Sequence, residues 1–279
     1  MAATLEYIGL NSLAPPSTIG GGTTTLTFAA ATSDCRARWL FIDGLVSAGN
    51  AFTPISPNLL GSIFVDSIRI NGGPNLVTGL IPLGCFTSQG MATNGFPSGE
   101  LNLSLSTGDV VTVGITDSNP NAQVSSSYSA ELKVDSASTT ALANTAVQVV
   151  GKSQYWLGHP SGSIVVGAGA SATWTSVAAP SQMYLDYWYN FATDSGATTD
   201  QSSTILLSSL TVSGAPAANF VNGFPTILPQ SGLQGACALD VGQQVRILVE
   251  AGETVAMVFN NISATSAHLA LGWSVLSND

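Results

Sequence analysis

The chain has 279 residues, 16 of them acidic and 6 basic, which gives a net charge of −10. Charged residues make up only 8% of the chain, whereas roughly a quarter is usual in soluble domains. Because Arg36 and Arg38 are the only close pair of basic residues, this composition argues against direct binding to a nucleic-acid backbone, which needs clustered Lys and Arg.

Small uncharged polar residues replace the missing charges. Such a surface favours either a protein that neighbouring chains largely cover or an extracellular protein. No uninterrupted apolar run reaches the roughly 18 residues that a membrane-spanning helix needs. The first residues, MAATLE, have neither a positive region nor an apolar run, so we expect a chain that folds in a cytoplasm.

The three cysteines, Cys35, Cys85 and Cys237, are then expected to stay reduced. Their odd number and wide spacing fit neither a disulfide framework nor a zinc site. We predict that they are buried as small apolar side chains.

Alternating apolar and polar residues predict β-strands along the first half of the chain. In chain order, the alternating runs are Thr24–Phe28, Ile63–Ile70, Leu101–Leu105, Val111–Ile115 and Ser127–Val134. A turn sequence, Ser106–Asp109, separates the third run from the fourth and predicts a hairpin.

The second half repeats this pattern at Val245–Val249, Val255–Phe259 and Ala267–Val275. The 29 Gly and 13 Pro residues are spaced like strand punctuation, and no long stretch keeps a helical period. Short helical turns are expected only at Pro57–Gly61 and near Asn75–Leu80. We therefore predict an all-β chain with about eight short strands in each half.

Five segments of the first half recur in the second half, in the same order and at offsets of about 141 to 148 residues. The matched pairs are Glu6–Gly9 with Gln148–Gly151, Thr23–Phe28 with Ala170–Thr175, Ser67–Pro74 with Ser209–Pro216, Leu101–Asp109 with Val245–Glu253, and Ala130–Val134 with Leu271–Val275. A repeat this long predicts a duplicated domain rather than a solenoid. We predict two tandem antiparallel β-sandwiches of the jelly-roll kind, residues 1–138 and residues 139–279, related by internal duplication.

Residues for catalysis are sparse. His159 lies in a predicted turn and His268 lies in or beside a strand, and neither has an obvious partner for general-base chemistry. The acids are scattered singly, and no calcium-binding, phosphate-binding or nucleophile-elbow motif is present. We predict no enzyme activity, no cofactor and no metal site.

One cluster of aromatic residues is a candidate contact site. Tyr184–Asn190 holds four aromatics in six residues, and Trp156 lies nearby in sequence. Exposed Trp156, Tyr187 and Tyr189 could anchor a subunit contact or stack on a sugar. The alternative is ordinary core and cross-strand packing. If the chain were a glycan lyase or hydrolase, Asp186 beside these aromatics would be the first acid to examine.

In architecture and composition, across its whole length, the chain resembles the double jelly-roll major capsid proteins of tailless icosahedral viruses, bacteriophages among them. That family has no diagnostic short motif, so no site residue carries over. The resemblance implies a homotrimer that places six similar modules in a pseudo-hexameric ring and tiles a shell with itself and other capsid proteins. It also implies a virion component assembled in the host cytoplasm, with genome contact left to other proteins. A membrane can lie beneath such a shell without insertion of this chain.

The rival interpretation is a carbohydrate-binding or adhesin-type pair of β-sandwiches on a virion or cell surface. An exposed, flat aromatic platform at Trp156, or at Tyr187 and Tyr189, would distinguish it from the capsid interpretation.

Overall fold

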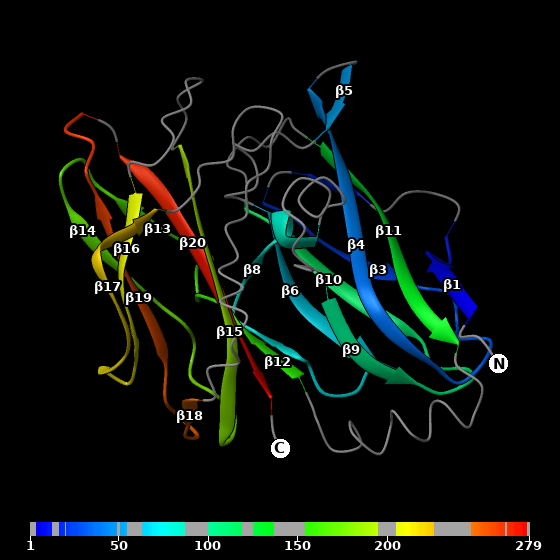
Figure 1. The fold of residues 1–279 in the computed structure, drawn as a ribbon. Coiled ribbons are helices and arrows are strands. Elements are labelled where there is room, and N and C mark those ends of the chain that lie inside the picture. Colours follow the sequence, from blue (N-terminus) through cyan, green and yellow to red (C-terminus); the bar gives the residue numbers. More distant parts are fainter. Residues whose placement is uncertain are drawn as a thin grey trace.

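The computed structural model describes residues 4–12, 17–19, 21–48, 51–54, 63–86, 100–118, 125–136, 154–194, 205–225, 247–265 and 267–277. Within these ranges the chain consists of β-strands, turns and one short 3-10 helix, which confirms the all-β fold class (Figure 1). The boundary expected at residues 138/139 lies outside the described residues. It falls between the last strand of the first half, which ends at Ser136, and the first strand of the second half, which begins at Gln154.

The first half forms two antiparallel sheets. Its elements are β1 (Thr4–Gly9), β2 (Ser17–Ile19), β3 (Thr23–Thr27), β4 (Cys35–Ala48), β5 (Ala51–Pro54), β6 (Ile63–Ile70), β7 (Val77–Thr78), β8 (Ile81–Pro82), η1 (Leu83–Phe86), β9 (Glu100–Leu105), β10 (Val111–Asp117) and β11 (Ser125–Ser136). One sheet has the order β1-β11-β4-β5, with β2 on β11 and β9 on β4, and the other has the order β3-β10-β6-β8.

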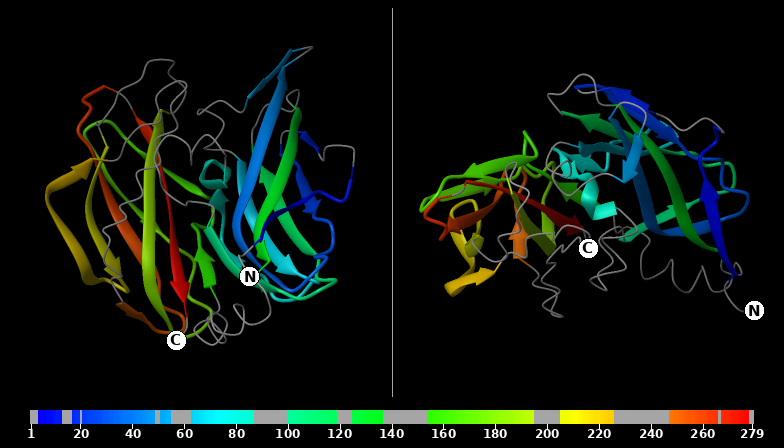
Figure 2. Two further views of the ribbon diagram at one scale, coloured as in Figure 1. Left: turned by 45° about the vertical axis from the view of Figure 1, so that its right-hand side comes forward. Right: turned by 90° about the horizontal axis from the view of Figure 1, so that it is seen from above.

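The second half repeats this arrangement. Its strands are β12 (Gln154–Leu157), β13 (Ser163–Val166), β14 (Ser171–Thr175), β15 (Met183–Asp194), β16 (Ile205–Val212), β17 (Ala215–Pro225), β18 (Ile247–Val249), β19 (Val255–Asn261) and β20 (His268–Ser277). One sheet holds β18-β15-β20-β12, with β13 on β20, and the other has the order β14-β19-β16-β17. Figures 1 and 2 show the two sandwiches side by side.

The described strands of the two halves follow the same topology, except that β5 has no described counterpart and β17 stands in place of β7 and β8. The central pair β4·β11 corresponds to β15·β20, and β3-β10-β6 corresponds to β14-β19-β16. The match extends to turns: the backbone N–H of Ser106 donates to the carboxylate of Asp109 at 2.8 Å, as that of Glu250 does to Glu253. The predicted duplication is therefore confirmed at the level of fold.

The structure corrects the register of two predicted matches and the position of a third. Leu26 of β3 lies opposite Val113, and its counterpart opposite Met257 is Trp174, one residue away from the predicted alignment. Val134 of β11 likewise corresponds to Leu276 and not to Val275. Val134 and Leu276 each come directly after the register shift in their ladder, whereas Val275 comes before it. A slip of one residue exchanges the two faces of a strand, and short alternating sequences match almost equally well at either register.

The third correction concerns the first strand. Gln148–Gly151, the predicted partner of Glu6–Gly9, lies outside the described residues. In the structure β12 takes the place of β1, because it pairs with β20 as β1 pairs with β11.

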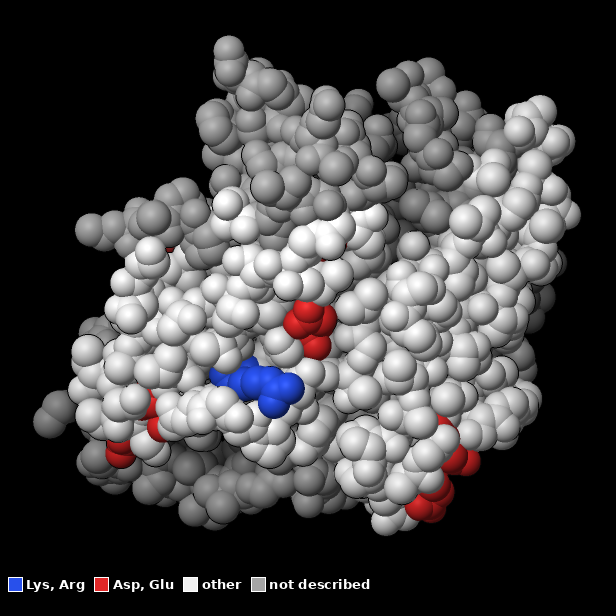
Figure 3. Space-filling view, turned by 180° about the vertical axis from the view of Figure 1, so that it is seen from behind, with Lys and Arg blue, Asp and Glu red and all other residues white. Residues whose placement is uncertain are grey.

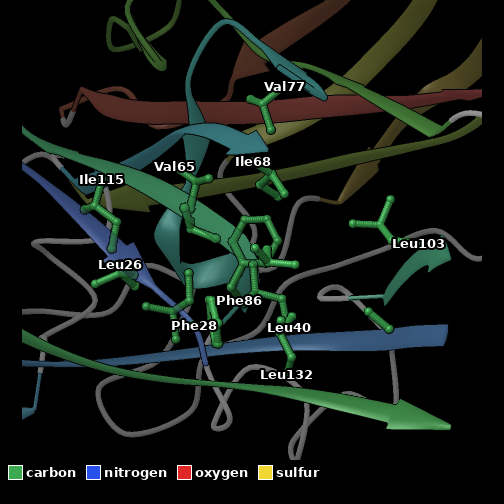
Figure 4. Close-up of a cluster of buried hydrophobic side chains, with 14 of the residues drawn as sticks. Leu26, Phe28, Leu40, Val65, Ile68, Val77, Phe86, Leu103, Ile115 and Leu132 are labelled. Carbon is green, nitrogen blue, oxygen red and sulfur yellow. The ribbon is translucent and has the colours of Figure 1, made fainter. Parts of the chain in front are cut away.

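Each sandwich has its own apolar core. The first core joins buried side chains from both sheets, among them Leu26 and Ile115 from one and Leu40 and Leu132 from the other (Figure 4). In the second core Trp174, Met257 and Phe259 pack with Leu185 and Leu276. Two face-to-face antiparallel sheets around one core in each half are the β-sandwich that the alternating patterns predict.

Candidate assembly surfaces and the seam between the halves

A short parallel strand pair joins the two sandwiches. Val77 and Thr78 of β7 lie opposite Trp156 and Leu157 of β12. The N–H of Trp156 donates to the carbonyl of Leu76 at 3.0 Å, and the N–H of Gly158 donates to the carbonyl of Thr78 at 2.7 Å. We call this β7·β12 contact the seam. It corrects the helical turn expected near Asn75–Leu80, while Pro57–Gly61 lies outside the described residues.

Two successive residues of β12 enter different cores. Trp156 packs in the core of the first sandwich and Leu157 in the core of the second, as expected when successive side chains of a strand point to opposite faces. Val77, the register partner of Trp156, is labelled at the edge of the first core in Figure 4. The seam thus combines backbone hydrogen bonds with a large buried aromatic side chain.

The placement of Trp156 corrects one predicted role. This side chain is only 2% exposed, so it is not part of an exposed sugar-binding platform. It is instead an anchor between the two halves of one chain. Its burial depends on the neighbouring sandwich, so the residues around it in the sequence could not predict that burial.

Two glycines allow the backbones to approach closely at the seam. A Cβ atom built on Gly79 would lie 2.5 Å from the carbonyl oxygen of Gly158, and one on Gly158 would overlap the backbone of Leu80. Gly79 also has a φ of 83°, in the left-handed region that favours glycine. Any side chain at these positions would push the halves apart.

Asn75 fixes the strand that enters the seam. Its Oδ1 accepts hydrogen bonds from the N–H groups of Ile68 and Val77, both at 3.0 Å, and its Nδ2 donates to the carbonyl of Asp66 at 3.0 Å. One side chain therefore connects β7 to the adjacent strand β6. This role was missed in the sequence because no local pattern shows which backbone groups an Asn side chain will reach.

His159 lies where the seam ends. Its carbonyl accepts a hydrogen bond from the N–H of Leu80 at 3.0 Å, and its ring centroid lies 6.0 Å from that of Trp174. Its Nδ1 accepts from the N–H of Ser161 at 3.1 Å, which is a contact within one turn. Burial lowers the pKa of His159 below its ordinary value of 6.5. These contacts indicate a structural histidine that is held neutral.

The other two predicted contact aromatics lie on β15. Tyr187 and Tyr189 are opposite Val275 and Trp273 of β20, and Asp186 occupies the irregularity just before them. The side chains of all three, and that of His268, lie outside the described part of the structure. A contact role for Tyr187 and Tyr189 stays a prediction.

Among the described residues, no group of three or more His, Cys, Asp and Glu side chains is arranged to hold a metal ion. Cys35 is buried, as predicted, whereas the side chains of Cys85 and Cys237 are outside the described set. Within the described ranges, no helix is long and apolar enough to cross a bilayer.

Among the residues whose side chains the structure describes, four large apolar ones are exposed, and none was singled out from the sequence as a contact residue. They are Tyr7 at 57%, Val165 at 62%, Leu248 at 42% and Ile262 at 63%. Elsewhere, the face in Figure 3 shows isolated charged patches on a largely uncharged surface. Such a surface leaves apolar and uncharged polar groups to make contacts with partners.

Two equivalent antiparallel sandwiches in tandem define a double jelly-roll architecture. The fold resembles the crystal structure of the STIV MCP, a major capsid protein, with 11% identity, a TM-score of 0.52, and coverage of 99% of this chain and 97% of that chain. At this identity the likeness establishes the fold alone.

Two further structures are similar at a lower level. PBCV-1 VP54, fitted into a reconstruction of the virophage Sputnik, has 9% identity, a TM-score of 0.40, and coverage of 100% of this chain and 95% of that chain. N-glycanase F has 10% identity, a TM-score of 0.41, and coverage of 99% and 96%. No protein-family model and no curated protein sequence matches the chain.

Proposed function

We propose that the chain is a viral major capsid protein whose homotrimer forms a pseudo-hexameric capsomer of an icosahedral shell. The observation that carries this proposal is the seam. Two sandwiches of equivalent topology lie side by side and are joined by the β7·β12 pair, so one chain supplies a pair of equivalent tiles. Three such chains supply six similar modules, the number that a ring with hexagonal outline needs.

The fold and the surface both support this proposal. The double jelly-roll likeness to the STIV MCP extends over almost the whole length of both chains. A low content of charged residues suits a protein whose surface is buried by other copies of the same chain. Burying an uncharged surface costs less desolvation free energy than burying a charged one. On this proposal the chain has no enzyme activity, resides in the virion, and assembles in the host cytoplasm with itself and other capsid proteins.

Genome contact is left to other components under this proposal. The described basic residues are not gathered into a patch that would follow a phosphate backbone: Arg36 is buried, and Arg69 donates to the carbonyl of Gly73 at 2.9 Å. A membrane beneath the shell would meet a protein of net charge −10, which anionic lipid repels.

Mass measurement of the purified chain tests the proposal directly. We expect a species three times the mass of the 28.4-kDa chain by light scattering, and hexagonal tiles, sheets or shells by electron microscopy at higher concentration. A protein that stays monomeric at high micromolar concentration and forms no tiles would contradict a capsid role.

The carbohydrate-binding alternative now depends on Tyr187 and Tyr189, because Trp156 is buried. Glycan-array binding that is lost in Tyr187→Ala, by a protein that remains monomeric, would favour this alternative. Tyr184→Ala on the same strand controls for the loss of an aromatic residue from β15, since Tyr184 lies opposite Ser277 at the start of the β15·β20 ladder, before the irregularity that precedes Tyr187.

A further inference from the structure

Each of the two strands that form the seam has a counterpart in the other half of the chain, and these counterparts do not pair with each other. Because the two halves have the same topology, β12 has a counterpart in the first half and β7 has one in the second.

The counterpart of β12 is β1, and the match can be made residue by residue. Tyr7 lies opposite Lys133 of β11, and Trp156 lies opposite Val275 of β20. Lys133 and Val275 occupy equivalent positions, because the ladders to β4 and β15 shift register immediately after each of them. Tyr7 is therefore the equivalent of Trp156.

Hydrogen bonds two residues further along support the same match. The carbonyl of Gly9 accepts from the N–H of Ala29 at 2.9 Å, and the carbonyl of Gly158 accepts from the N–H of Val177 at 2.9 Å. Gly9 is thus the equivalent of Gly158. Since the N–H groups of Trp156 and Gly158 donate across the seam, those of Tyr7 and Gly9 face away from β11.

The counterpart of β7 lies within β17. Both segments follow an equivalent strand, β6 or β16, through an equivalent turn with positive φ at Asn71 and Ser213. Further along, Ile81 lies opposite Val65 as Phe224 lies opposite Leu207. The stretch of β17 around Asn219, before Phe224, therefore occupies the place of β7.

Both counterparts are edge strands among the described strands. β1 ends one sheet and β17 ends another, each with a ladder on one side. Figures 1 and 2 place them on opposite outer sides of the molecule, with the seam between them. An edge strand offers a row of backbone groups to another chain, and Tyr7 adds an aromatic side chain that is 57% exposed.

We infer that copies of this chain join head to tail by pairing β1 of one copy with β17 of the next, in the parallel arrangement of β12 and β7. In this contact Tyr7 is buried against the neighbouring copy as Trp156 is buried within the chain. This inference rests on the proposed capsomer and names the surfaces that build it. A head-to-tail contact of this kind closes into a ring of three chains when the rotation from one copy to the next is one third of a full turn.

Photo-crosslinking tests which surfaces meet. A benzoyl-phenylalanine introduced in place of Tyr7 in the full chain is irradiated in the oligomer, and the adducts are mapped by mass spectrometry. We expect inter-chain adducts within residues 215–225. The same probe in place of Val165, which is 62% exposed on β13, is the control and should not reach those residues. Adducts from position 7 that map elsewhere overturn the inference.

A matched pair of charge variants tests whether the contact matters. Tyr7→Glu and Val165→Glu add the same charge at similarly exposed positions on β-strands. We expect Tyr7→Glu to raise the concentration at which the oligomer dissociates by about ten-fold or more, and Val165→Glu to leave it nearly unchanged. Melting curves must show both variants folded, as their exposure predicts.

The outcomes separate this inference from the proposed function. An oligomer of three chains that survives Tyr7→Glu unchanged overturns the β1·β17 contact and leaves the capsomer standing. A wild-type chain that never oligomerises overturns both.

Discussion

At the scale of single residues, the seam depends on glycines that permit close backbone approach. Gly79 and Gly214 have nearly the same φ, 83° and 82°, but only Gly79 faces another backbone, that of Gly158. Replacement by Ala at either site imposes the left-handed penalty of about 1–2 kcal/mol. We expect Gly79→Ala to lower the free energy of unfolding by about 1–3 kcal/mol beyond Gly214→Ala, because its methyl group also overlaps the seam.

Urea titrations of the two variants measure this difference. Gly214→Ala controls for conformational strain, since a Cβ there meets nothing within 4 Å. Equal loss of stability in both variants would mean that the halves can separate without cost at this point.

The histidine at the seam predicts a dependence of stability on pH. Burial lowers the pKa of His159, so the folded chain binds a proton less readily than the unfolded chain, in which the pKa is 6.5. The stabilising contribution of neutral His159 is therefore present above pH 6.5 and is lost as the pH falls through the folded-state pKa. Protonation also removes the Nδ1 acceptor used by the N–H of Ser161.

Urea midpoints at about pH 7.5 and about pH 5 check this prediction. His159→Asn keeps an acceptor but does not titrate, so it should lose less stability on acidification than the wild type. His268→Asn is the control for the other histidine. A wild type and a His159→Asn variant with the same pH dependence would argue against the prediction.

At the scale of elements, β7 is a strand of two residues that a side chain holds in place. Asn75→Leu removes the acceptor for the N–H groups of Ile68 and Val77, and an unmade hydrogen bond to a buried group costs about 1–3 kcal/mol. We expect faster hydrogen exchange at Val77 and at Trp156, whose N–H donates across the seam. Asn75→Asp keeps the acceptor and should exchange more slowly than Asn75→Leu.

Hydrogen-exchange mass spectrometry can resolve this effect. Peptides from β14 and β19 of the second sandwich should be unchanged, because these strands belong to the sheet that does not pair with β7. Loss of protection across both sandwiches would instead indicate global destabilisation.

The elements also show how far the sequence could predict the fold. Alternation located β10 and β19 correctly, because each strand has one face toward a core, with a burial pattern that repeats every second residue. Register was harder: Val134 and Val275 are the same residue type, but Val134 follows the irregularity in its ladder and Val275 precedes the equivalent one, and only the partner strands show this difference. β7 was mistaken for a helical turn because two residues carry no period.

Candidate sites were harder to predict for a related reason. Trp156 was recognised as a contact aromatic, but its partner is another sandwich, and no local pattern indicates contacts between domains. Tyr7 has no neighbouring aromatic cluster, and its importance emerges only from its equivalence to Trp156. Sequence reasoning therefore reached the repeated module and not the edges through which modules join.

At the scale of the whole molecule, the low charge predicts assembly that tolerates salt. Raising ionic strength from about 0.1 M to about 1 M shortens the screening length from roughly 10 Å to roughly 3 Å, which weakens exposed charge pairs. With 8% charged residues, few such pairs are available between chains, and the seam that we expect to recur is made of backbone hydrogen bonds and buried aromatic surface. Neither contribution is strongly screened.

Light scattering across a sodium chloride series checks this expectation. The mass of the oligomer should stay constant, and sulfate, which strengthens apolar burial, should favour larger assemblies. Tyr7→Glu offers an internal comparison, since a charge placed in the contact should make the remaining association depend on salt. Dissociation of the wild type between about 0.1 M and about 0.5 M salt would show that charge pairs dominate the contact, because only screening changes strongly over that interval.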